Sequence, residues 1–430
     1  MTLQGCRALA AGMEKTGRAV AAFLAERGAL VTTTDLKPHD VPGFRPQTEE
    51  LFDEAWNLIV LSPGVPCDLP GLERARARGV EVIGEVELAA PYLQGRIIGI
   101  TGSNGKTTTT SLVAHVLHEA GVAAQTGGNI GTPVVAMVAG SRADQWNVLE
   151  LSSFQLETTR TLRAHVGVCL NVTQNHLDRH YTLERYAEAK GQLFRQQQAT
   201  DFAVLNAGDA VCRSYATLTP AEPCWFSSSD VRDGQVYVDG QVLMPLEDIP
   251  IPGMHNAENV LAAARVARIA GVSLAVIADA VRSFHAVEHR LEFVAEINGV
   301  RFYNDSKATS VDATIKALDS FPSGLWVILG GKDKGSDYTL LTDRLQRKAR
   351  GVLLIGAAAD IIESQLAGKV VTQRVGTMER ALDTAWALAR PGDTVLLAPA
   401  CASFDQFQSY EHRGTVFKEL VRGLPHGAAA

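Results

Sequence analysis

The sequence predicts an α/β fold divided into three domains. Its 430 residues are enough for two to four domains of about 100–200 residues each. Short apolar segments typical of buried strands alternate along the chain with longer segments of helical periodicity. Such alternation favours parallel sheets covered by helices on both faces, whose ligands bind at the carboxyl ends of the strands.

The first block reads as a strand, a helix and two further strands. We expect strands at 6–11, 29–35 and 57–64, and a helix at 17–27. The third strand, NLIVLSPG, ends in a Pro-Gly turn. This order predicts a Rossmann-like N-terminal domain over residues 1–90.

A second domain built on a parallel sheet is expected over residues 91–286. It opens with the strand RIIGIT, a glycine-rich turn and a helix. Region 219–253 is richer in Pro, Gly and short alternating segments, which predicts hairpins and loops. Strands are expected at 96–101, 146–151, 165–171 and 202–206, and helices at 106–120, 182–197, 256–270 and 274–284.

The third domain, residues 287–430, is expected to be a second Rossmann-like α/β domain. It begins with a hairpin at 291–303, turned by Asn298 and Gly299. Strands and helices then alternate again. The strands are expected at 325–329, 351–355 and 394–398, and the helices at 338–347, 358–366, 377–389 and 411–422.

Composition limits the function classes. The chain is 46% hydrophobic and 20% charged, with a net charge of −7. The absence of a Lys/Arg run argues against a nucleic-acid partner, and no apolar stretch is long enough to span a membrane. Six cysteines without a CxxC pair fit a reducing compartment. No signal-peptide pattern is evident, so we expect a cytoplasmic protein. We also expect the protein to be a monomer.

The segment GITGSNGKTTTTS, residues 99–111, indicates the chemistry. A strand leads into glycines that let backbone N–H groups face phosphates, and a helix begins at Lys106. Lys106 would reach the β- and γ-phosphates, and the Thr107 hydroxyl would ligate Mg²⁺. The alternative is a plain strand-to-helix turn with an exposed lysine. The order of elements predicts a P-loop domain that binds a nucleoside triphosphate through Gly102, Ser103, Asn104, Gly105, Lys106, Thr107 and Thr108.

Two more polar segments follow buried strands. LELSSFQLE places Glu150 at a strand end, where a carboxylate is costly unless it is ion-paired in the core or bound to a metal. NVTQNHLDRH places His176 and Asp178 after another strand, although a lone histidine is more often an ordinary loop residue. Lys190 lies on the following helix, where a lysine by itself is usually solvated.

Together these segments resemble the Mur ligase family of ATP-dependent amide-forming enzymes. The matching segments are Thr101–Thr107, Glu150–Gln155, Asn171–Asp178 and Lys190. The resemblance extends over essentially the whole chain through GMHNAENVLAA, EHRLE, NDSKAT, GGKDKG and PACASFDQF. The NDSKAT and ACASFDQF strings are most similar to the D-glutamate-adding branch, and the DNPR string of the diamino-acid-adding branch is absent.

The resemblance implies a ligase that joins UDP-N-acetylmuramoyl-L-alanine to D-glutamate in cytoplasmic peptidoglycan precursor synthesis. ATP phosphorylates the terminal carboxylate, the amine of D-glutamate attacks the acyl phosphate, and the tetrahedral intermediate collapses to an amide. Because the reactants are anions, catalysis is mostly charge neutralisation and positioning.

The resemblance also implies roles for individual residues. Thr107 and Glu150 would hold one Mg²⁺, and His176 with a carbamylated Lys190 a second, while Lys106 and Lys307 would act on the reacting groups. Asn129 and Ser152 would contact the muramoyl-alanine part. The nucleotide would meet Asn256, Asn259, His289, Arg290 and Asp305, and the amino acid would meet Lys307, Thr309, Lys334, Ser403 and Tyr410.

Several of these residues also have plain structural interpretations. Asn256 and Asn259 could be residues of a helix cap and first turn. His289 and Arg290 could form a linker ion pair, and Ser403 could be a turn residue.

The UDP part of the substrate should bind the first domain. Thr16 begins a helix, Asp35 ends the second strand, and Lys37 and Ser62 follow strand ends. Each could equally be a cap or a strand-end residue. Glu14 stands where the family often has glycine, and an acid there is unfavourable near a diphosphate unless it points away.

Two other classes remain open at this point. Another Mur ligase or a folylpolyglutamate synthetase would share the P-loop and the lysines. A P-loop kinase or a non-enzymatic nucleotide-binding module would show no ATP cleavage that depends on an amino acid.

Overall fold

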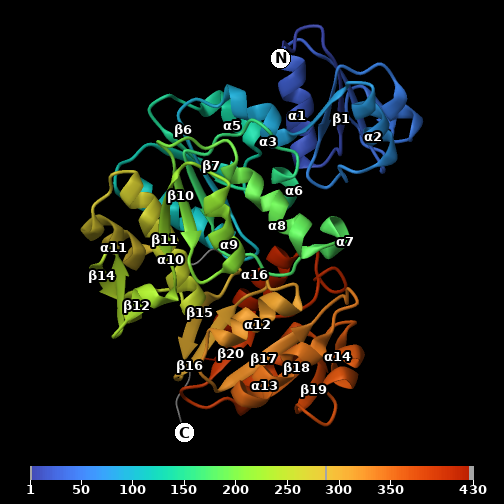
Figure 1. Ribbon diagram of the computed structural model, residues 1–430. Coiled ribbons are helices and arrows are strands. Elements are labelled where there is room, and N and C mark those ends of the chain that lie inside the picture. The colour runs from blue at the N-terminus through green and yellow to red at the C-terminus, as the bar shows by residue number, and fades with distance from the viewer. Residues whose placement is uncertain (1, 286–287, 426–430) are drawn as a thin grey trace. The chain divides into compact units, whose positions relative to one another are not determined.

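The computed structural model describes residues 2–285 and 288–425 and has the expected mixed α/β architecture (Figure 1). The chain divides into two compact units. The first comprises Met1–Leu246 with Glu258–Arg282, and the second Glu247–Ala257 with Ser283–Ala430. Among the described residues, no helix is long and apolar enough to cross a membrane.

The first unit begins with a parallel sheet in the order β3-β2-β1-β4-β5, the arrangement expected of a Rossmann-like block. Ala8 and Ala10 pack on the side of α1, whereas Leu9 and Ala11 pack on the side of α2. Figure 1 shows these two helices on opposite sides of β1. The elements are β1 (Arg7–Ala11), α1 (Lys15–Glu26), β2 (Leu30–Asp35), β3 (Phe44–Pro46), β4 (Leu58–Leu61), α2 (Pro70–Ala77), β5 (Glu81–Gly84) and α3 (Glu85–Ala89).

The turn between β1 and α1 depends on a very close backbone approach. Gly17 lies in the first turn of α1, and a Cβ built on it would be 1.6 Å from the carbonyl oxygen of Gly12. Gly12 itself has φ 90°, and its carbonyl accepts a hydrogen bond of 2.7 Å from Ser62 Oγ. Glycine at position 17 therefore sets how closely the helix follows the strand.

The second sheet of this unit is six-stranded and parallel, in the order β11-β10-β9-β6-β8-β7. Its central strand β6 is the one that leads into the predicted P-loop. The strands are β6 (Arg96–Thr101), β7 (Ala124–Gly128), β8 (Trp146–Glu150), β9 (Val166–Cys169), β10 (Phe202–Asn206) and β11 (Glu222–Phe226).

The expectation of only hairpins and loops over 219–253 was wrong in part. Residues Glu222–Phe226 form β11, which extends the parallel sheet beside β10. The hairpins follow in a small antiparallel sheet of β12 (Val231–Arg232), β13 (Gln235–Val238) and β14 (Gln241–Pro245). The helices that accompany the second sheet are α4 (Lys106–Glu119), α5 (Val134–Met137), α6 (Ser153–Leu156), α7 (Leu177–His180), α8 (Leu183–Gly191), α9 (Ala210–Ser214), α10 (Met254–Ile269) and α11 (Leu274–Ser283).

Two buried carboxylates in α3 join the first sheet to the second. Glu85 Oε1 accepts a hydrogen bond of 2.7 Å from the amide of Val135. Glu87 accepts hydrogen bonds from the amides of Arg160 and Thr161 and from the Thr161 hydroxyl. The bonds to Glu87 offset the desolvation of its carboxylate, whereas Glu85 Oε2 is buried without a hydrogen-bond partner and burial raises the pKa of Glu85 to about 7. Together the two side chains fix α3 between the two sheets.

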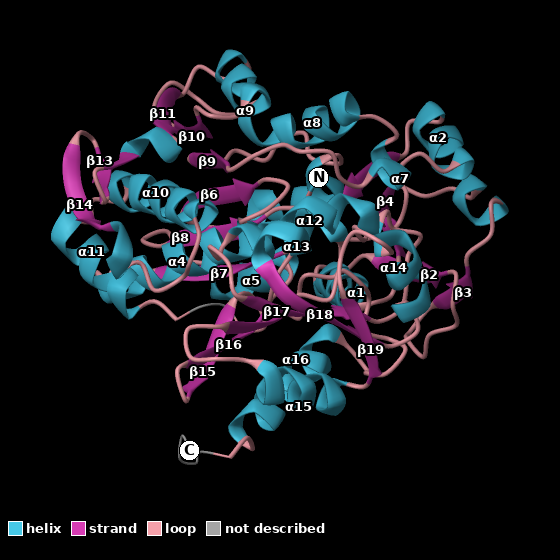
Figure 2. Ribbon diagram, turned by 90° about the horizontal axis from the view of Figure 1, so that it is seen from below, coloured by secondary structure: helices cyan, strands magenta, loops and turns pink. Residues whose placement is uncertain are grey.

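The second unit contains a sheet in the order β15-β16-β20-β17-β18-β19, with only β15 antiparallel to its neighbour. Val327 and Leu329 pack on the side of α12, α13 and α14, whereas Ile328 packs on the side of α15 and α16. Figure 2 shows the two groups of helices on opposite faces. The elements are β15 (Glu292–Ile297), β16 (Val300–Asn304), α12 (Val311–Asp319), β17 (Leu325–Gly330), α13 (Thr342–Lys348), β18 (Ala349–Ile355), α14 (Ala359–Leu366), β19 (Thr372–Gly376), α15 (Met378–Leu388), β20 (Thr394–Leu397) and α16 (Tyr410–Arg422).

We predict that Gly17→Ala destabilises the protein by about 1–3 kcal/mol, because its methyl group meets backbone atoms that cannot rotate away. Gly64→Ala is the matched control, since a Cβ at Gly64 meets nothing within 4 Å. Thermal unfolding of both variants measures the difference. Equal melting temperatures would show that the β1–α1 turn tolerates the added atom.

Candidate active site

The predicted P-loop connects β6 to α4. Gly105 precedes the helix with φ 85°, a left-handed conformation that glycine adopts without strain. A Cβ on Gly105 would also lie 2.3 Å from Asn259 Oδ1, so α10 leaves no space for a side chain there. Thr107 and Thr108 are buried in the first turn of α4. The positive end of a 14-residue helix thus faces the glycine turn.

The segment after β9 holds this loop in place. The Asn104 amide donates to Asn171 Oδ1 at 2.9 Å. Ser103 Oγ donates to the Thr173 carbonyl at 3.0 Å and accepts from the Thr173 amide at 2.9 Å. These bonds make the loop rigid before any ligand binds, which reduces the entropy lost on binding.

Two lysines converge on one carbonyl oxygen of the loop. Lys106 Nζ donates to the Gly102 carbonyl at 2.9 Å and to the Ser103 carbonyl at 3.2 Å. Lys190 Nζ also donates to the Gly102 carbonyl at 2.9 Å, although Lys190 comes from α8. The side chain of Lys190 is only 1% exposed, so the interpretation of a solvated helix lysine is excluded.

The environment of Lys190 disfavours its charged form. Burial, followed by repulsion from Lys106, holds the pKa of Lys190 well below its usual range, and the carboxylate of Glu150 opposes this shift only in part. The Tyr186 ring lies 4.5 Å from Lys190 Nζ. His176, in a left-handed conformation with φ 53°, has its ring 6.3 Å from the same Tyr186 ring. The structure thus brings the two predicted ligands of a second metal ion to one aromatic side chain.

Glu150 is buried at the end of β8. Its Oε1 accepts a hydrogen bond of 2.8 Å from Asn129 Nδ2, while its Oε2 is buried without a hydrogen-bond partner. Within the described part of the chain Glu150 forms no ion pair, so the alternative of an ion-paired core acid does not apply. An unsatisfied buried carboxylate oxygen beside a P-loop is the type of ligand that Mg²⁺ prefers, and the residues present therefore fit that ion.

The residues predicted to contact the muramoyl-alanine part lie next to Glu150. Two hydrogen bonds join Asn129 to Glu150. Besides the side-chain bond described above, the main-chain amide of Asn129 donates to the Glu150 carbonyl at 2.8 Å. Ser152 forms a capping box with Gln155 at the start of α6. Its hydroxyl therefore has a local structural task in addition to any contact with a substrate.

In the first sheet, the predicted residues Asp35, Lys37 and Ser62 lie at or just after the carboxyl ends of β2 and β4, the two strands that flank β1. Asp35 accepts hydrogen bonds from the amides of Met13 and Lys37 and forms an ion pair of 3.5 Å with His39. Ser62 binds the carbonyl of the β1–α1 turn, as described above. Thr16 is half-buried in the first turn of α1, and Lys37 is exposed. Asp35 thus shapes the turn, which the sequence did not predict.

Glu14 precedes α1 and is exposed, and its side chain makes no capping hydrogen bond. The carboxylate is therefore not a structural part of the turn.

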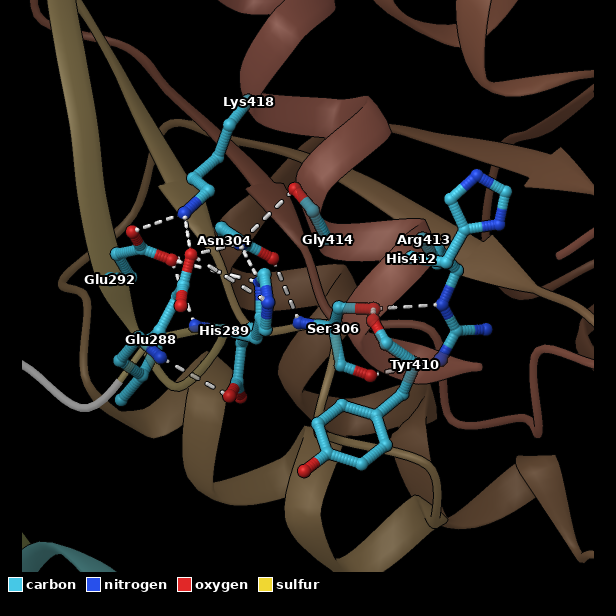
Figure 3. A network of polar contacts seen from close by, with 12 residues as sticks. Glu288, His289, Glu292, Asn304, Ser306, Tyr410, His412, Arg413, Gly414 and Lys418 are labelled. Carbon is cyan, nitrogen blue, oxygen red and sulfur yellow. Dashed lines mark hydrogen bonds and ion pairs between the residues drawn. The ribbon is translucent and has the colours of Figure 1, made fainter. Parts of the chain in front are cut away.

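In the second unit, the predicted nucleotide residues lie where β15 and β16 meet. His289 is buried with φ 64°, and its Nδ1 is 2.9 Å from Asn304 Nδ2 (Figure 3). The Leu291 amide donates to Asp305 Oδ1 at 3.2 Å. Burial raises the pKa of the Asp305 carboxyl to about 6, and the nearby charge of Arg290 opposes that rise.

Most of the predicted amino-acid residues are linked by contacts within the same unit. Lys307 Nζ lies 5.7 Å from the centre of the Tyr410 ring. Lys334 Nζ donates to the Thr309 carbonyl at 3.3 Å. Ser403 is buried, and its carbonyl accepts the amide of Phe407 at 2.9 Å, so it also starts a turn as the sequence allowed.

The two asparagines of α10 differ in their surroundings. Asn259 Oδ1 accepts a hydrogen bond of 3.3 Å from Thr109 Oγ1 beside the P-loop. Asn256 Nδ2 donates to the Pro252 carbonyl at 2.7 Å, a contact with the turn before the helix. Asn256 lies in the first turn of α10, one of the structural interpretations that the sequence left open.

Sequence reasoning missed Tyr186, which contacts Lys190, and the buried Arg413, which contacts the residues that precede Lys307 and Ser403 in the chain. Nothing in the pattern distinguishes Arg413 from the exposed Arg422 of the same helix, because burial is decided by neighbours far away in sequence.

Comparison with known proteins agrees with these features. The sequence profile of the Mur ligase middle domain matches residues 100–267, and that of the Mur ligase glutamate ligase domain matches residues 289–401. The chain belongs to the Mur ligase family. A relative from Solibacter usitatus, named UDP-N-acetylmuramoylalanine–D-glutamate ligase, is 63% identical over 99% of both chains. A relative of the same name from Acidobacterium capsulatum is 49% identical over 100% of this chain and 98% of its own.

Solved structures of Mur ligases share the fold. The Thermotoga maritima UDP-N-acetylmuramate-alanine ligase MurC has a TM-score of 0.61 at 18% identity, covering 97% of this chain and 99% of its own. The Thermotoga maritima MurF ligase, solved in complex with ADP, has a TM-score of 0.62 at 16% identity, covering 98% and 99%.

We predict that Asp305→Asn changes how stability depends on pH. The folded carboxyl has a pKa of about 6, above the unfolded value of ~3.9, so its favourable contribution is lost as pH rises between these values. The loss amounts to about 2–3 kcal/mol by pH 7. The melting temperature of the variant minus that of the wild type should therefore increase from pH 4 to 6 and stay constant above pH 7. A difference in melting temperature that does not depend on pH would contradict the raised pKa of Asp305.

Proposed function

We propose that this protein is an ATP-dependent ligase that forms an amide bond between UDP-N-acetylmuramoyl-L-alanine and D-glutamate through an acyl phosphate. One observation supports the proposed chemistry. Lys106, Lys190 and Glu150, whose Oε2 has no hydrogen-bond partner, lie close together at the β6–α4 turn. The choice of substrates rests on the names of the full-length relatives and on the NDSKAT and ACASFDQF strings.

The proposal assigns one task to each of three domains. Residues 1–90 bind the UDP part through Thr16, Asp35, Lys37 and Ser62. Residues 91–286 bind ATP, and residues 287–430 bind D-glutamate. The reaction belongs to peptidoglycan precursor synthesis in the cytoplasm and is carried out by a monomer.

Charge neutralisation is the main work of the first step. The carboxylate of the muramoyl-alanine substrate must approach the γ-phosphate of ATP, and both groups are anions. Lys106 and the amides of Gly102–Thr108 face the phosphates, and Asn129 orients the carboxylate substrate. These groups are fixed before the reaction, so little reorganisation is needed in the transition state.

Mg²⁺ supplies further neutralisation of the phosphate oxygens when it is bound. Thr107 and Glu150 are the ligands proposed for one ion, and His176 with Lys190 for another. A cationic lysine cannot ligate a metal. Addition of CO₂ to the neutral amine of Lys190, with loss of a proton, forms a carbamate that can. The low pKa of Lys190 supports this modification, because only the neutral amine reacts.

In the second step the amine of D-glutamate attacks the acyl phosphate. Lys307 and Lys334 offer positive charge to the carboxylates of the amino acid, and Thr309, Ser403 and Tyr410 orient it. Asn256, Asn259, His289, Arg290 and Asp305 contact the nucleotide, with Asp305 accepting from the ribose. The tetrahedral intermediate then expels phosphate.

Phosphate release in the presence of Mg-ATP and UDP-N-acetylmuramoyl-L-alanine tests the function. We expect release to require D-glutamate and to be at least tenfold slower with L-glutamate at equal concentration. Lys106→Ala should abolish release, because the γ-phosphate loses its fixed positive charge. Equal rates with both enantiomers, or release without an amino acid, would overturn the assignment. Preference for a different amino acid would indicate another activity of the family.

Carbamylation is tested separately with ¹³C-labelled bicarbonate. We expect a carbamate signal in the carbon NMR spectrum of the wild-type protein that disappears in Lys190→Arg. Lys348→Arg is the control and should keep the signal, since Lys348 binds main-chain carbonyls of the second unit. A signal that persists in Lys190→Arg would disprove the modification of Lys190.

A further inference from the structure

One face of α16 packs against the loops that carry predicted site residues of the second unit (Figure 3). Tyr410, Arg413, Gly414 and Lys418 recur at helical spacing, so they share this face. Arg413 is 0% exposed and is the largest fully buried side chain among the described residues. None of the functions assigned above uses it.

The Arg413 guanidinium joins two loops. Its Nε donates to Ser306 Oγ at 2.9 Å, and its Nη2 donates to the Ser306 carbonyl at 2.9 Å. Both Nη atoms donate to the Cys401 carbonyl at 3.2 Å, and Nη1 also reaches the Ala402 carbonyl at 3.4 Å. Lys307 follows Ser306 directly, and Ser403 follows Ala402. The guanidinium therefore sets the spacing between two predicted amino-acid residues.

Arg413 forms no ion pair among the described residues, and the more distant carboxylate of Asp405 offsets its charge only in part. All its hydrogen bonds run to carbonyl or hydroxyl oxygens, and no carboxylate lies within ion-pair distance of it. Burial lowers the pKa of Arg413 to about 10, so the guanidinium remains protonated at neutral pH. A buried cation that forms no ion pair is costly for folding, which favours a functional reason for its position.

We propose that Arg413 is a positioning residue of the amino-acid site: it holds Lys307 and Ser403 at a fixed spacing and adds positive potential for a dicarboxylate. This rests on the proposed function. Arg413 makes no contact with the amino acid itself, because it is wholly covered by the two loops. The planar guanidinium donates hydrogen bonds to both loops at the same time, which the single ammonium group of a lysine cannot do.

The next residues of the same face serve the nucleotide side. A Cβ on Gly414 would lie 2.2 Å from His289 Nδ1, so this glycine determines where the imidazole sits. Lys418 Nζ binds Glu292 Oε1 at 3.0 Å, and the Glu292 Oε2 atom accepts the His289 amide at 2.8 Å. Substitutions at the neighbouring positions 413 and 414 are therefore expected to affect different substrates.

The test compares Michaelis constants for the three substrates. Arg413→Lys keeps the charge but loses the planar guanidinium, so we expect KM for D-glutamate to rise about tenfold or more. KM for ATP and for the UDP-substrate should stay within about twofold. Arg422→Lys, an exposed position on the same helix, should change none of the three constants. Gly414→Ala should instead raise KM for ATP, because its methyl group displaces His289.

Ser306→Ala provides a second variant in case Arg413→Lys does not fold. It removes the hydroxyl that accepts from Nε and donates to the Tyr410 carbonyl at 2.8 Å, and we expect KM for D-glutamate to rise about threefold. A parallel change in all three constants, or a change in kcat alone, would overturn the positioning role. Wild-type protein without D-glutamate-dependent phosphate release would overturn the proposed function instead, so the two failures are distinguishable.

Discussion

The sharing of the Gly102 carbonyl by Lys106 and Lys190 is the constraint on which the candidate site depends. Both ammonium nitrogens lie 2.9 Å from that oxygen, so the charge of Lys106 disfavours a second positive charge on Lys190. Lys190 is the more deeply buried lysine, so its pKa falls and it can exist as a neutral amine. Glu150, with its unsatisfied Oε2 at the end of β8, adds negative charge to the same end of the sheet. The roles proposed for the two lysines, a cation for phosphate and a ligand for a metal, rest on this difference in burial.

The two units position their polar site residues in different ways. In each, polar groups lie beyond the carboxyl ends of parallel strands, where loops can present them without disturbing the sheet. The first unit holds its P-loop through the Asn171 side chain and the main chain of Thr173. The second uses long side chains of α16 that reach back into two loops. Arg413 joins those loops at a cost in desolvation, and the proposed positioning role gives a reason for that cost.

The sequence predicted the central strands well and the edges of the sheets poorly. Strands β6 and β10 lie at the expected residues, because a strand with two neighbours is buried on both faces and reads as a continuous apolar run. The strands β3, β5, β7, β11 and β19 were not expected, and all five lie at an edge of a sheet. An edge strand has one neighbour and more solvent contact, so its sequence is less distinctive.

The sequence by itself determined the α/β class, the P-loop, the family and the residues that are candidates for each ligand. These are local features, since turn glycines, strand ends and helix starts are written in short segments. Only the tertiary structure decided that Lys190 is buried, that Glu150 has an unsatisfied oxygen and that Arg413 joins two loops. Burial and charge compensation depend on groups brought together from distant parts of the chain, and no short segment contains that information.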